Sequence, residues 1–203
     1  MITITQGYSL TEFRAASMFM DRKQLFIDLM GWKLPVLEGL YEIDQFDGDR
    51  AIYIVEADPN DRHIGSMRLL PSEWPHILSE LFADLCDDDV PRGAHVMEVT
   101  RLCLPARLRA AGRLGLRNRL VTAMVDYALE HDVSVLTGIT SASFFRQICS
   151  MGWRCRPLGA TRYLDGDLVV PFRIDLDADT PARLAISGVY TPGAVAHPIR
   201  RAA

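Results

Sequence analysis

The sequence predicts a mixed α/β protein whose central sheet is covered by helices on both faces. Apolar runs and alternating patterns typical of strands are interleaved with segments of helical periodicity. From residue 95 onward strands and helices follow one another in turn. Strands separated by helices favour partly parallel pairing, so we expect the sheet to be mixed.

The first half of the chain is expected to hold helices followed by strands. Residues 2–5 alternate apolar and polar side chains, as a half-buried strand does. A broken apolar stripe predicts helix until Gly31, a typical helix stop, and the turn residues 58–61 separate two strands. The expected elements are a strand over 2–5, one or two helices over 11–29, strands over 51–56 and 64–70, a helix over 74–85 and a strand over 95–104.

The second half begins with the clearest helix of the chain. Pairs of residues such as Leu120/Val121 and Met124/Val125 recur at helical spacing. A short apolar run follows, then a helix that stops at Gly152. The expected elements are a helix over 114–131, a strand over 133–139, a helix over 143–151 and a strand over 168–176.

Composition indicates one ordinary globular domain over residues 1–203, with an irregular tail from about 188 to 203. The chain is 49% hydrophobic and 24% charged, with a formal charge of −4. No apolar run is long enough to cross a bilayer, and the first residues do not resemble a signal peptide.

The four cysteines lack CxxC spacing, so we expect reduced thiols in the cytoplasm and neither structural zinc nor a disulfide framework. The mild acidity and the scarcity of lysine (2 residues, against 20 arginines) disfavour nucleic-acid binding.

The stretch from Arg22 to Asp47 gathers aromatic and acidic residues just before a strand. They include the aromatics Phe26 and Trp32 and the acids Glu42, Asp44 and Asp47. Glu42 and Asp44 are expected to share one side of an extended segment. Close carboxylates repel one another unless cations balance them. The acids therefore form either a turn cluster paired with arginine or a pocket for a cationic small molecule, where the rings add cation–π contacts. Oxygen ligands alone would suit magnesium or calcium, but the spacing matches no calcium loop.

Ionisable residues also interrupt two apolar strands. Glu98 and Arg101 lie in one and Arg68 in the other, and charges there are costly unless paired. Strict alternation puts Glu98 and Arg101 on opposite faces, whereas a bulge between them would bring both to one side. Glu98 is either part of a structural ion pair with Arg68 or Arg22, or a general base held by arginines. Arg68 either caps a buried acid or grips a substrate carboxylate with a bidentate fork.

A third candidate lies where the long helix begins, at Arg109-Ala-Ala-Gly112-Arg113. Glycine-containing turns at helix N-termini expose N–H groups to anions. The segment is similar to the Arg/Gln-x-x-Gly-x-Gly/Ala loop with which acyl-CoA-dependent acetyltransferases bind pyrophosphate, although Leu114 makes the match partial. The five histidines are not paired at metal-ligand spacing, and we expect no metal site.

Taken together, these stretches resemble the acyl-homoserine-lactone synthases, the autoinducer synthases of bacterial quorum sensing. The resemblance covers about residues 8 to 175, and its motifs agree in both order and spacing. They are Arg22-x3-Phe26, Gly31-Trp32, Glu42-x-Asp44-x2-Asp47, Gly65-x2-Arg68-Leu-x-Pro71 and Glu98-x2-Arg101.

The resemblance implies a three-layer α/β/α sandwich like that of the N-acetyltransferases. It also implies an acyltransferase that takes an acyl thioester, on acyl carrier protein or on CoA, and S-adenosylmethionine as the acceptor. The products would be an N-acyl-L-homoserine lactone, methylthioadenosine and the freed carrier. No cofactor, nucleic-acid partner or membrane partner is implied.

Site roles follow from the same resemblance. Glu98 is the expected general base, acting through water, with Arg101 and Asp44 as further catalytic residues and Thr100 and Glu42 in support. Backbone N–H groups over 99–103 would stabilise the oxyanion. The residues expected to bind S-adenosylmethionine are Arg22, Phe26, Trp32, Asp44, Asp47, Arg68 and Arg101.

The acyl chain and its carrier need an apolar pocket and a basic surface. The expected pocket residues are Met124, Thr140, Phe144, Phe145, Ile148 and Trp153. Within the arginine-rich segment from 107 to 119 and beyond it, the residues expected to meet the carrier or its pantetheine arm are Arg109, Arg113, Arg117 and Arg146. Thr140 stands where members that favour 3-oxo chains often have threonine.

Two positions depart from the family pattern. Thr100 replaces a frequent serine and keeps the hydroxyl, and Phe144-Phe145 stands in a helix where the family often has an acid. The aromatic pair leads to the hypothesis that short, branched or aryl acyl groups are selected and are delivered by CoA. Two other functions fit the residues: a CoA-dependent N-acyltransferase for another amine, and a non-catalytic sensor that binds S-adenosylmethionine.

Overall fold

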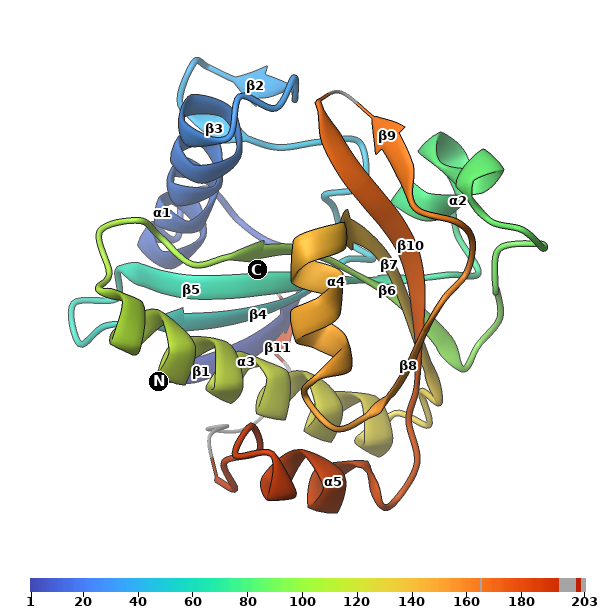
Figure 1. Ribbon diagram of the computed structural model, residues 1–203. Helices are drawn as coiled ribbons and strands as arrows, with labels where there is room; N and C mark the ends of the chain where they lie inside the picture. Colours follow the sequence, from blue (N-terminus) through green and yellow to red (C-terminus); the bar gives the residue numbers. More distant parts are fainter. Residues whose placement is uncertain (165, 194–199, 202–203) are drawn as a thin grey trace. The chain divides into compact units, whose positions relative to one another are not determined.

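The computed structural model describes residues 1–164, 166–193 and 200–201 (Figure 1). The chain divides into two compact units. Unit 1 comprises Met1–Leu69, Arg101–Ala123 and Pro192–Ala203, and unit 2 comprises Leu70–Thr100 and Met124–Thr191. The single domain expected over 1–203 stays a prediction. Residues 194–199 and 202–203 of the expected tail lie outside the described residues.

Unit 1 is built around three neighbouring antiparallel strands in the order β1, β4, β5. The register pairs Ile4 with Ile54 between β1 and β4, and Tyr53 with Arg68 between β4 and β5. The elements of this unit are β1 (Ile2–Gln6), α1 (Phe13–Arg22), a π-helix (Lys23–Leu29), β2 (Val36–Leu37), β3 (Tyr41–Glu42), β4 (Ile52–Ala57) and most of β5 (His63–Pro71). It also holds the end of β6 (Val96–Cys103), the first two-thirds of α3 (Ala110–Glu130) and β11 (Arg200–Arg201), which pairs in parallel with β1.

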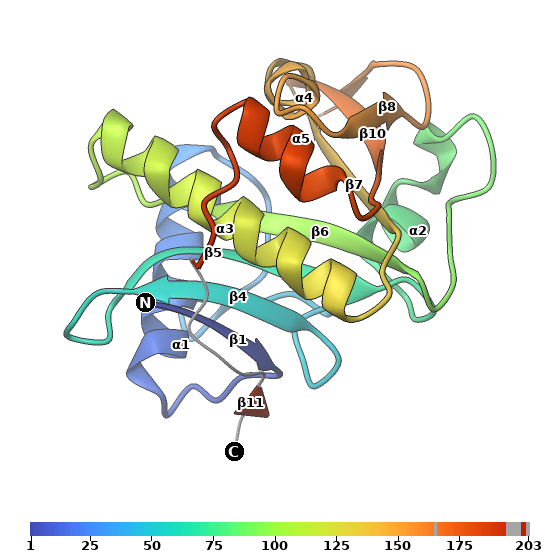
Figure 2. The ribbon, with the colours of Figure 1, turned by 90° about the horizontal axis from the view of Figure 1, so that it is seen from below.

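Helices α1 and α3 cover opposite faces of β4 and β5 (Figures 1 and 2). On β4, Tyr53 packs edge-on against Phe19 of α1, at 6.1 Å between ring centroids. Glu56 is three residues further along β4 and therefore on the other face, where it pairs with Arg119 of α3. On the α3 face, a Cβ at Gly65 would come within 2.6 Å of Leu116, so glycine permits the close packing of helix and strand. These contacts confirm a three-layer arrangement in this unit.

The helix expected over 11–29 is present in two parts. Helix α1 continues without interruption into the π-helix and turns away at Gly31, whose φ of +74° suits glycine. The wider π-helical turn is frequent at functional sites. It holds Phe26 in the interior of the unit.

Unit 2 contains a mixed sheet, as expected from its interleaved helices. Strand β6 runs parallel to β7 and pairs with it from Val96 to Glu98, while β10 is antiparallel to β7, β8 and β9. Apart from the start of β6 and the end of α3, its elements are α2 (Ile77–Leu81), a 3₁₀ turn (Ala83–Leu85), β7 (Val135–Ser141), α4 (Ala142–Cys149), β8 (Arg154–Pro157), β9 (Arg162–Leu164), β10 (Asp167–Asp175) and α5 (Thr180–Ile186).

Two helix boundaries differ from the sequence-based expectation. The helix expected over 74–85 is only the short α2 and a 3₁₀ turn, because Pro75 disfavours helical backbone at Trp74. Helix α3 begins at Ala110 rather than at 114. The alanines at 110 and 111 are strong helix formers and outweigh Gly112, and the Arg113 N–H already donates to the Arg109 carbonyl at 3.0 Å. Gly112 therefore lies in the first helical turn and not in a loop.

Short elements without a strong periodic pattern were not expected from the sequence. These are β2, β3, β8, β9, α5 and β11, and β11 lies in the tail that was expected to be irregular. Among the described residues no helix combines the length and the apolar character needed to span a membrane.

Candidate functional site

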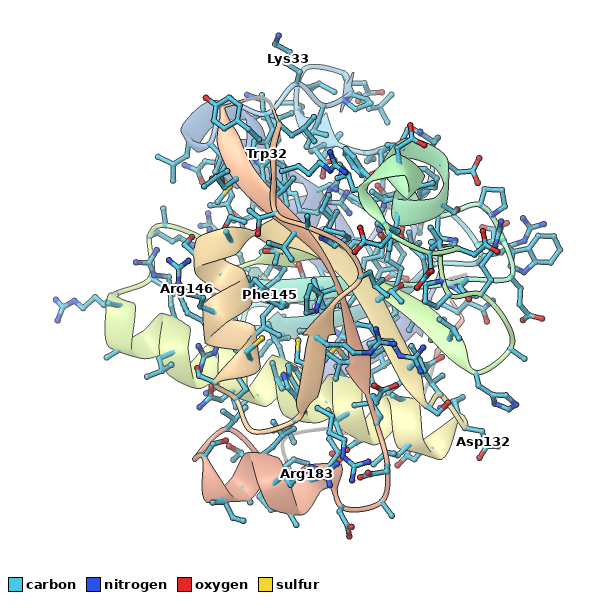
Figure 3. The ribbon with its side chains drawn as sticks, turned by 45° about the vertical axis from the view of Figure 1, so that its right-hand side comes forward. Trp32, Lys33, Asp132, Phe145, Arg146 and Arg183 are labelled. Carbon is cyan, nitrogen blue, oxygen red and sulfur yellow. The ribbon has the colours of Figure 1, made fainter. Side chains whose placement is uncertain are left out.

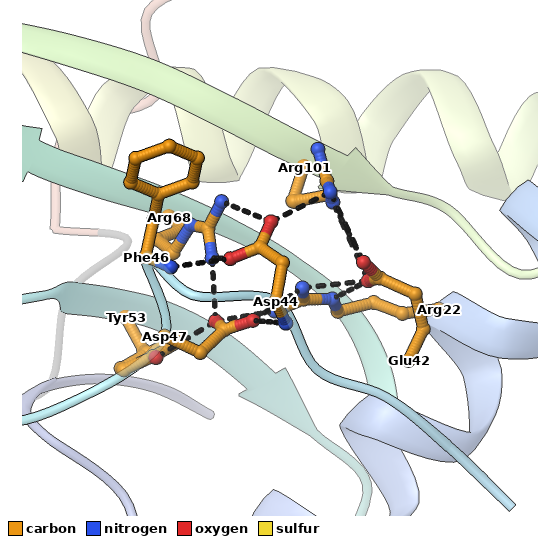
Figure 4. Close-up of polar contacts among 8 residues, drawn as sticks. All are labelled: Arg22, Glu42, Asp44, Phe46, Asp47, Tyr53, Arg68 and Arg101. Atoms are coloured by element: carbon orange, nitrogen blue, oxygen red, sulfur yellow. Dashed lines mark hydrogen bonds and ion pairs between the residues drawn. The ribbon is translucent and has the colours of Figure 1, made fainter. Parts of the chain in front are cut away.

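A closed network of three arginines and three carboxylates forms the centre of unit 1 (Figure 4). Its members come from α1, the segment around β3, strand β5 and the end of β6, and they are Arg22, Glu42, Asp44, Asp47, Arg68 and Arg101. Their formal charges cancel. The fold therefore brings into one cluster Arg101 and all the motif arginines and acids between residues 22 and 68 that were expected at the substrate site.

Asp47 is one of two carboxylates of the network whose side chains have no exposed surface, the other being Glu42. Arg22 grips it with two hydrogen bonds of 2.9 Å, and Arg68 Nη1 lies 2.7 Å from Oδ1. The Tyr53 hydroxyl and the Asp44 backbone N–H also donate to it, each at 2.9 Å. Its side chain is 0% exposed. These donors already occupy the hydrogen-bond acceptor positions of both carboxylate oxygens. The role of Asp47 is therefore to hold the arginines in place.

Glu42 and Asp44 share Arg101, which confirms that they face the same side. Arg101 Nη2 lies 3.0 Å from Glu42 and 2.7 Å from Asp44. Glu42 also accepts from Arg22 at 2.6 Å, and Asp44 accepts from both terminal nitrogens of Arg68 at 2.7 and 3.0 Å. The structure thus shows Arg68 capping buried acids, one of the two roles expected for it.

Arg101 reaches the network through an unusual backbone conformation. Its φ is +52°, in the left-handed region that costs a non-glycine residue about 1–2 kcal/mol. The regular strand alternation is broken at this residue, in line with the irregularity expected between Glu98 and Arg101. Backbone strain of this kind is characteristic of functional positions.

The network keeps its central groups charged. Burial disfavours the charged form of Arg22, but Asp47 and Glu42 outweigh that effect and raise the pKa of Arg22 above its ordinary value. Burial likewise opposes ionisation of Asp47, yet Arg22 and Arg68 hold the pKa of its carboxyl well below the usual range. For Arg101 burial dominates and lowers the pKa of the guanidinium.

Two aromatic rings form an open edge beside the network. Phe26 and Trp32 stack at 5.0 Å between centroids with an interplanar angle of 9°. The Arg101 guanidinium carbon lies 5.7 Å from the Phe26 centroid, within cation–π range. Phe26 is buried, whereas Trp32 is 47% exposed. The stack therefore offers an aromatic surface that a ligand can reach from solvent.

Glu98 and Thr100 belong to unit 2. Glu98 is fully buried and accepts a hydrogen bond of 3.0 Å from the Leu78 N–H at the start of α2. In the parallel ladder it is paired with Thr137 of β7. Thr100 is half-buried. A carboxylate fixed in this way among apolar residues suits a proton-transfer role.

The residues expected to form the acyl pocket all lie in unit 2. Met124, Ile148 and Trp153 are buried, and the Trp153 indole N–H donates to the Ile148 carbonyl at 2.8 Å. Phe145 is half-buried on α4, with its ring 6.3 Å from that of Phe172 on β10. Figure 3 shows Phe145 and Arg146 leaving α4 on different sides. Thr140 and Phe144 are half-buried.

The arginines between 101 and 119 have distinct roles. Arg107 pairs with Asp21, Arg119 pairs with Glu56, and Arg117 bonds the Asn118 side chain at 2.9 Å. Arg109 is exposed and Arg113 is half-buried, and neither has a carboxylate partner among the described residues. Both guanidinium groups therefore remain available for an anion. Arg146 is exposed on α4.

Some structural partners were not expected from the sequence. Tyr53 donates to Asp47, and Arg107 joins the buried Asp21 and His63 in a second polar cluster. A tyrosine hydroxyl among the apolar residues at the start of β4 was the available signal for Tyr53. Within the described ranges, no three His, Cys, Asp or Glu side chains are grouped so as to hold a metal ion.

Similarity to known proteins was found at the level of family and of individual relatives. Residues 7–184 match the family described as autoinducer synthase. An acyl-homoserine-lactone synthase of Ralstonia nicotianae is 33% identical over 195 residues, which cover 92% of this chain and 95% of the relative.

Solved structures show the same likeness. TofI, in a ternary complex with an inhibitor and MTA, is 30% identical with a TM-score of 0.77, covering 96% of this chain and 99% of TofI. BjaI, a CoA-dependent acyl-homoserine lactone synthase with SAM and isopentyl-CoA, has a TM-score of 0.84 over 99% of this chain and 92% of BjaI, and at 19% identity shows the fold alone. A putative N-acetyltransferase from Lactobacillus plantarum has a TM-score of 0.58 at 22% identity over 87% of this chain and 98% of its own. The expected N-acetyltransferase-like fold class is confirmed.

Proposed function

The chain belongs to the autoinducer synthase family, and on that basis we propose that its arginine–carboxylate network binds S-adenosylmethionine as the acceptor of an acyl group. Like the relatives named acyl-homoserine-lactone synthases, the chain is an acyltransferase that makes a quorum-sensing signal. The observation that carries the site proposal is the closed cluster that joins all six motif arginines and acids in unit 1.

The acceptor's charges suit this site. S-adenosylmethionine carries a sulfonium, an ammonium and a carboxylate. The network is formally neutral, and among the described residues Arg101 Nη1 makes no hydrogen bond, so it is available for the substrate carboxylate (Figure 4). Asp44 lies against Arg101 and is the carboxylate that we propose for the substrate ammonium. The Phe26–Trp32 stack provides a π face for the sulfonium or the adenine.

Not every motif residue needs to touch the substrate. Asp47 has no exposed side-chain surface, and Arg22 and Arg68 are each 1% exposed. We assign these three, with Glu42, to holding Arg101 and Asp44 in position. Removing any of them would then disturb binding through the network.

Glu98 is the proposed general base. It lies three residues before Arg101, so the two Cα atoms are at most about 11 Å apart whatever the backbone conformation. The substrate ammonium loses a proton to Glu98 through water, and the free amine attacks the thioester carbonyl. Backbone N–H groups over 99–103 are proposed to stabilise the oxyanion. Collapse of this intermediate forms the amide and releases the carrier thiolate, which takes up a proton.

Lactonisation follows within the bound product. Its carboxylate attacks the carbon next to the sulfonium, the carbon–sulfur bond breaks, and methylthioadenosine leaves with the electron pair on sulfur. Since this step is intramolecular, the positioning of the carboxylate by Arg101 supplies much of its rate. The reaction needs neither a metal nor a prosthetic group, so dialysis against EDTA should leave turnover unchanged.

The donor is proposed to be an acyl thioester whose phosphate-bearing arm meets Arg109 and Arg113, and Arg117 and Arg146 are the other residues proposed to meet the carrier. The acyl chain would lie among Met124, Thr140, Phe144, Phe145, Ile148 and Trp153. Aromatic crowding on α4 favours short, branched or aryl groups on CoA. We also expect the chain to act in the cytoplasm and to have no nucleic-acid partner.

Turnover with a panel of acyl-carrier-protein and CoA thioesters tests the donor proposal. Preferential use of short, branched or aryl CoA thioesters would support it, and efficient use of long linear chains alone would contradict it.

The substitution Glu98→Gln tests the general base. This variant should still bind S-adenosylmethionine but lose at least about a hundredfold in kcat, as loss of a general base does. Undiminished turnover would exclude Glu98 as the base.

A further inference from the structure

A second polar cluster in unit 1, formed by the buried Asp21 and His63 with the partly exposed Arg107, lies outside the substrate network and has no assigned role. Its centre is Asp21, whose carboxylate accepts from His63 Nδ1 at 2.6 Å and from Arg107 at 2.5 and 2.8 Å. Arg107 Nη2 also donates to the His63 carbonyl at 2.5 Å. We call Asp21, His63 and Arg107 the Asp21 clamp.

The clamp is held rigidly on its inner side. His63 is fully buried, its backbone N–H donates to the Ser17 hydroxyl at 3.0 Å, and its Nε2 lies 2.9 Å from the Ser66 hydroxyl. Because ionised Asp21 accepts at Nδ1, the neutral ring carries its proton there and accepts from Ser66 at Nε2. Burial lowers the pKa of His63, which keeps the ring neutral at pH 7.

On its outer side the clamp holds an irregular segment. Residues 104–109 connect β6 to α3, and within them Arg107 is the one described residue whose side chain makes a hydrogen bond or an ion pair. Two residues later come Arg109 and then the first turn of α3 with Arg113. The next anchor along the helix is the ion pair between Arg119 and Glu56.

The same helical turn serves the clamp and the substrate network. Asp21 and Arg22 are the last two residues of α1, and Arg22 binds Glu42 and Asp47 while Asp21 binds Arg107. The position of the 104–109 segment is therefore fixed relative to the network through one rigid turn.

We propose that Arg107 is a positioning residue, which through the Asp21 clamp holds Arg109 and Arg113 at a fixed place for the phosphate of the acyl donor. Here the donor role of these two arginines rests on the proposed function. The clamp itself does not bind the donor, since both terminal nitrogens of Arg107 are committed to Asp21 and His63.

The existence of the clamp is tested without substrate. Arg109 is followed by alanine in an exposed segment, so trypsin cuts after it when the segment opens. Asp21→Asn and Arg107→Gln should each speed this cleavage about tenfold, the effect of losing a charged hydrogen bond. The matched control is Arg119→Gln, which breaks the ion pair with Glu56 further along α3. The side chains of Arg119 and Arg107 are similarly exposed, at 37% and 32%, and this control should leave the cleavage rate within twofold of wild type. Equal cleavage in wild type and clamp variants would overturn the proposal.

The consequence for the donor is tested by kinetics. Asp21→Asn should raise KM for the acyl thioester about tenfold while KM for S-adenosylmethionine stays within twofold, and Arg107→Gln should do the same. The double variant should be no worse than either single one, because both remove one interaction. Arg107→Lys should recover part of the loss. If Arg107 instead bound phosphate directly, Asp21→Asn would free it and leave or lower the donor KM, which would contradict the proposal.

The two tests separate the two levels of inference. If no acyl thioester is turned over, the proposed function fails, and the trypsin result still decides whether the clamp holds the segment. If the enzyme turns over but the donor KM is the same in all clamp variants, the proposed function stands and the positioning role of Arg107 is refuted.

Discussion

Asp47→Asn should be among the most destabilising single substitutions in unit 1. It preserves the side-chain volume but removes the charge that faces Arg22 and Arg68, both 1% exposed. Removing one partner of a buried ion pair costs about 3–5 kcal/mol of unfolding free energy. At about 2–4 °C per kcal/mol for a chain of this size, the Tm should fall by about 6–20 °C.

Two variants calibrate this effect in the same thermal unfolding measurement. Tyr53→Phe removes only the hydroxyl that donates to Asp47 and should cost about 1.5–3 kcal/mol, the usual value for a hydrogen bond to a charged group. Asp61→Asn breaks the exposed pair with Arg14, whose side chains are 50% and 29% exposed, and should cost less than about 1 kcal/mol. A Tm for Asp47→Asn within about 2 °C of wild type, or no lower than that of Asp61→Asn, would refute the view of Asp47 as the buried anchor of the network.

Three further predictions concern the aromatic stack, His63 and a close backbone contact. Trp32→Ala should raise KM for S-adenosylmethionine about three- to tenfold, because it removes the outer ring of the stack. Trp32→Phe and the exposed control Trp74→Ala should each change this KM less than twofold. Equal KM values for all three variants would contradict a role for the stack. Burial lowers the folded-state pKa of His63 below its unfolded value, so its contribution to stability is present above about pH 6.5 and is lost as the pH falls. Between pH 7.5 and 5.5 the Tm of wild type should therefore fall more steeply than that of His63→Asn, and parallel curves would argue against a buried neutral ring. Gly138→Ala would place a Cβ 2.8 Å from Phe172 and 2.9 Å from the Val99 carbonyl, and should lower the free energy of unfolding in urea by about 1–3 kcal/mol. The control Gly112→Ala has open space around its Cβ and should not destabilise the protein. Equal urea midpoints for the two variants would show that the β7 backbone moves to accommodate the methyl group at little cost.

Periodicity was sufficient to predict most of the larger elements. The stripe before Gly31 and the pairs from Leu120 to Leu129 led to α1 and α3, because burial on one face imposes a 3.6-residue repeat. The two-residue strands β2 and β3 are too short for any repeat to show. Their position depends on tertiary contacts such as those of Glu42 with Arg22 and Arg101.

The composition of the site was predictable, but its pairing was not. Charged residues in apolar strands marked Arg68, Glu98 and Arg101, since such charges need partners. Which acid each arginine meets depends on chain separations of 20 to 59 residues within the network, as between Glu42 and its partners Arg22 and Arg101. The left-handed backbone at Arg101 has no local signal, because arginine has no preference for positive φ. The Asp21 clamp links residues 86 apart and was invisible for the same reason.

The central claim is that one amine acylation and one lactonisation occur on the same bound S-adenosylmethionine. Single-turnover reactions with an accepted acyl thioester, followed by mass spectrometry, measure this directly. We predict acyl-homoserine lactone, methylthioadenosine and free carrier thiol in a 1:1:1 ratio, and lactone formation by Glu98→Gln that is at least about a hundredfold slower. Release of carrier thiol without methylthioadenosine, or acylation of a different amine, would contradict it.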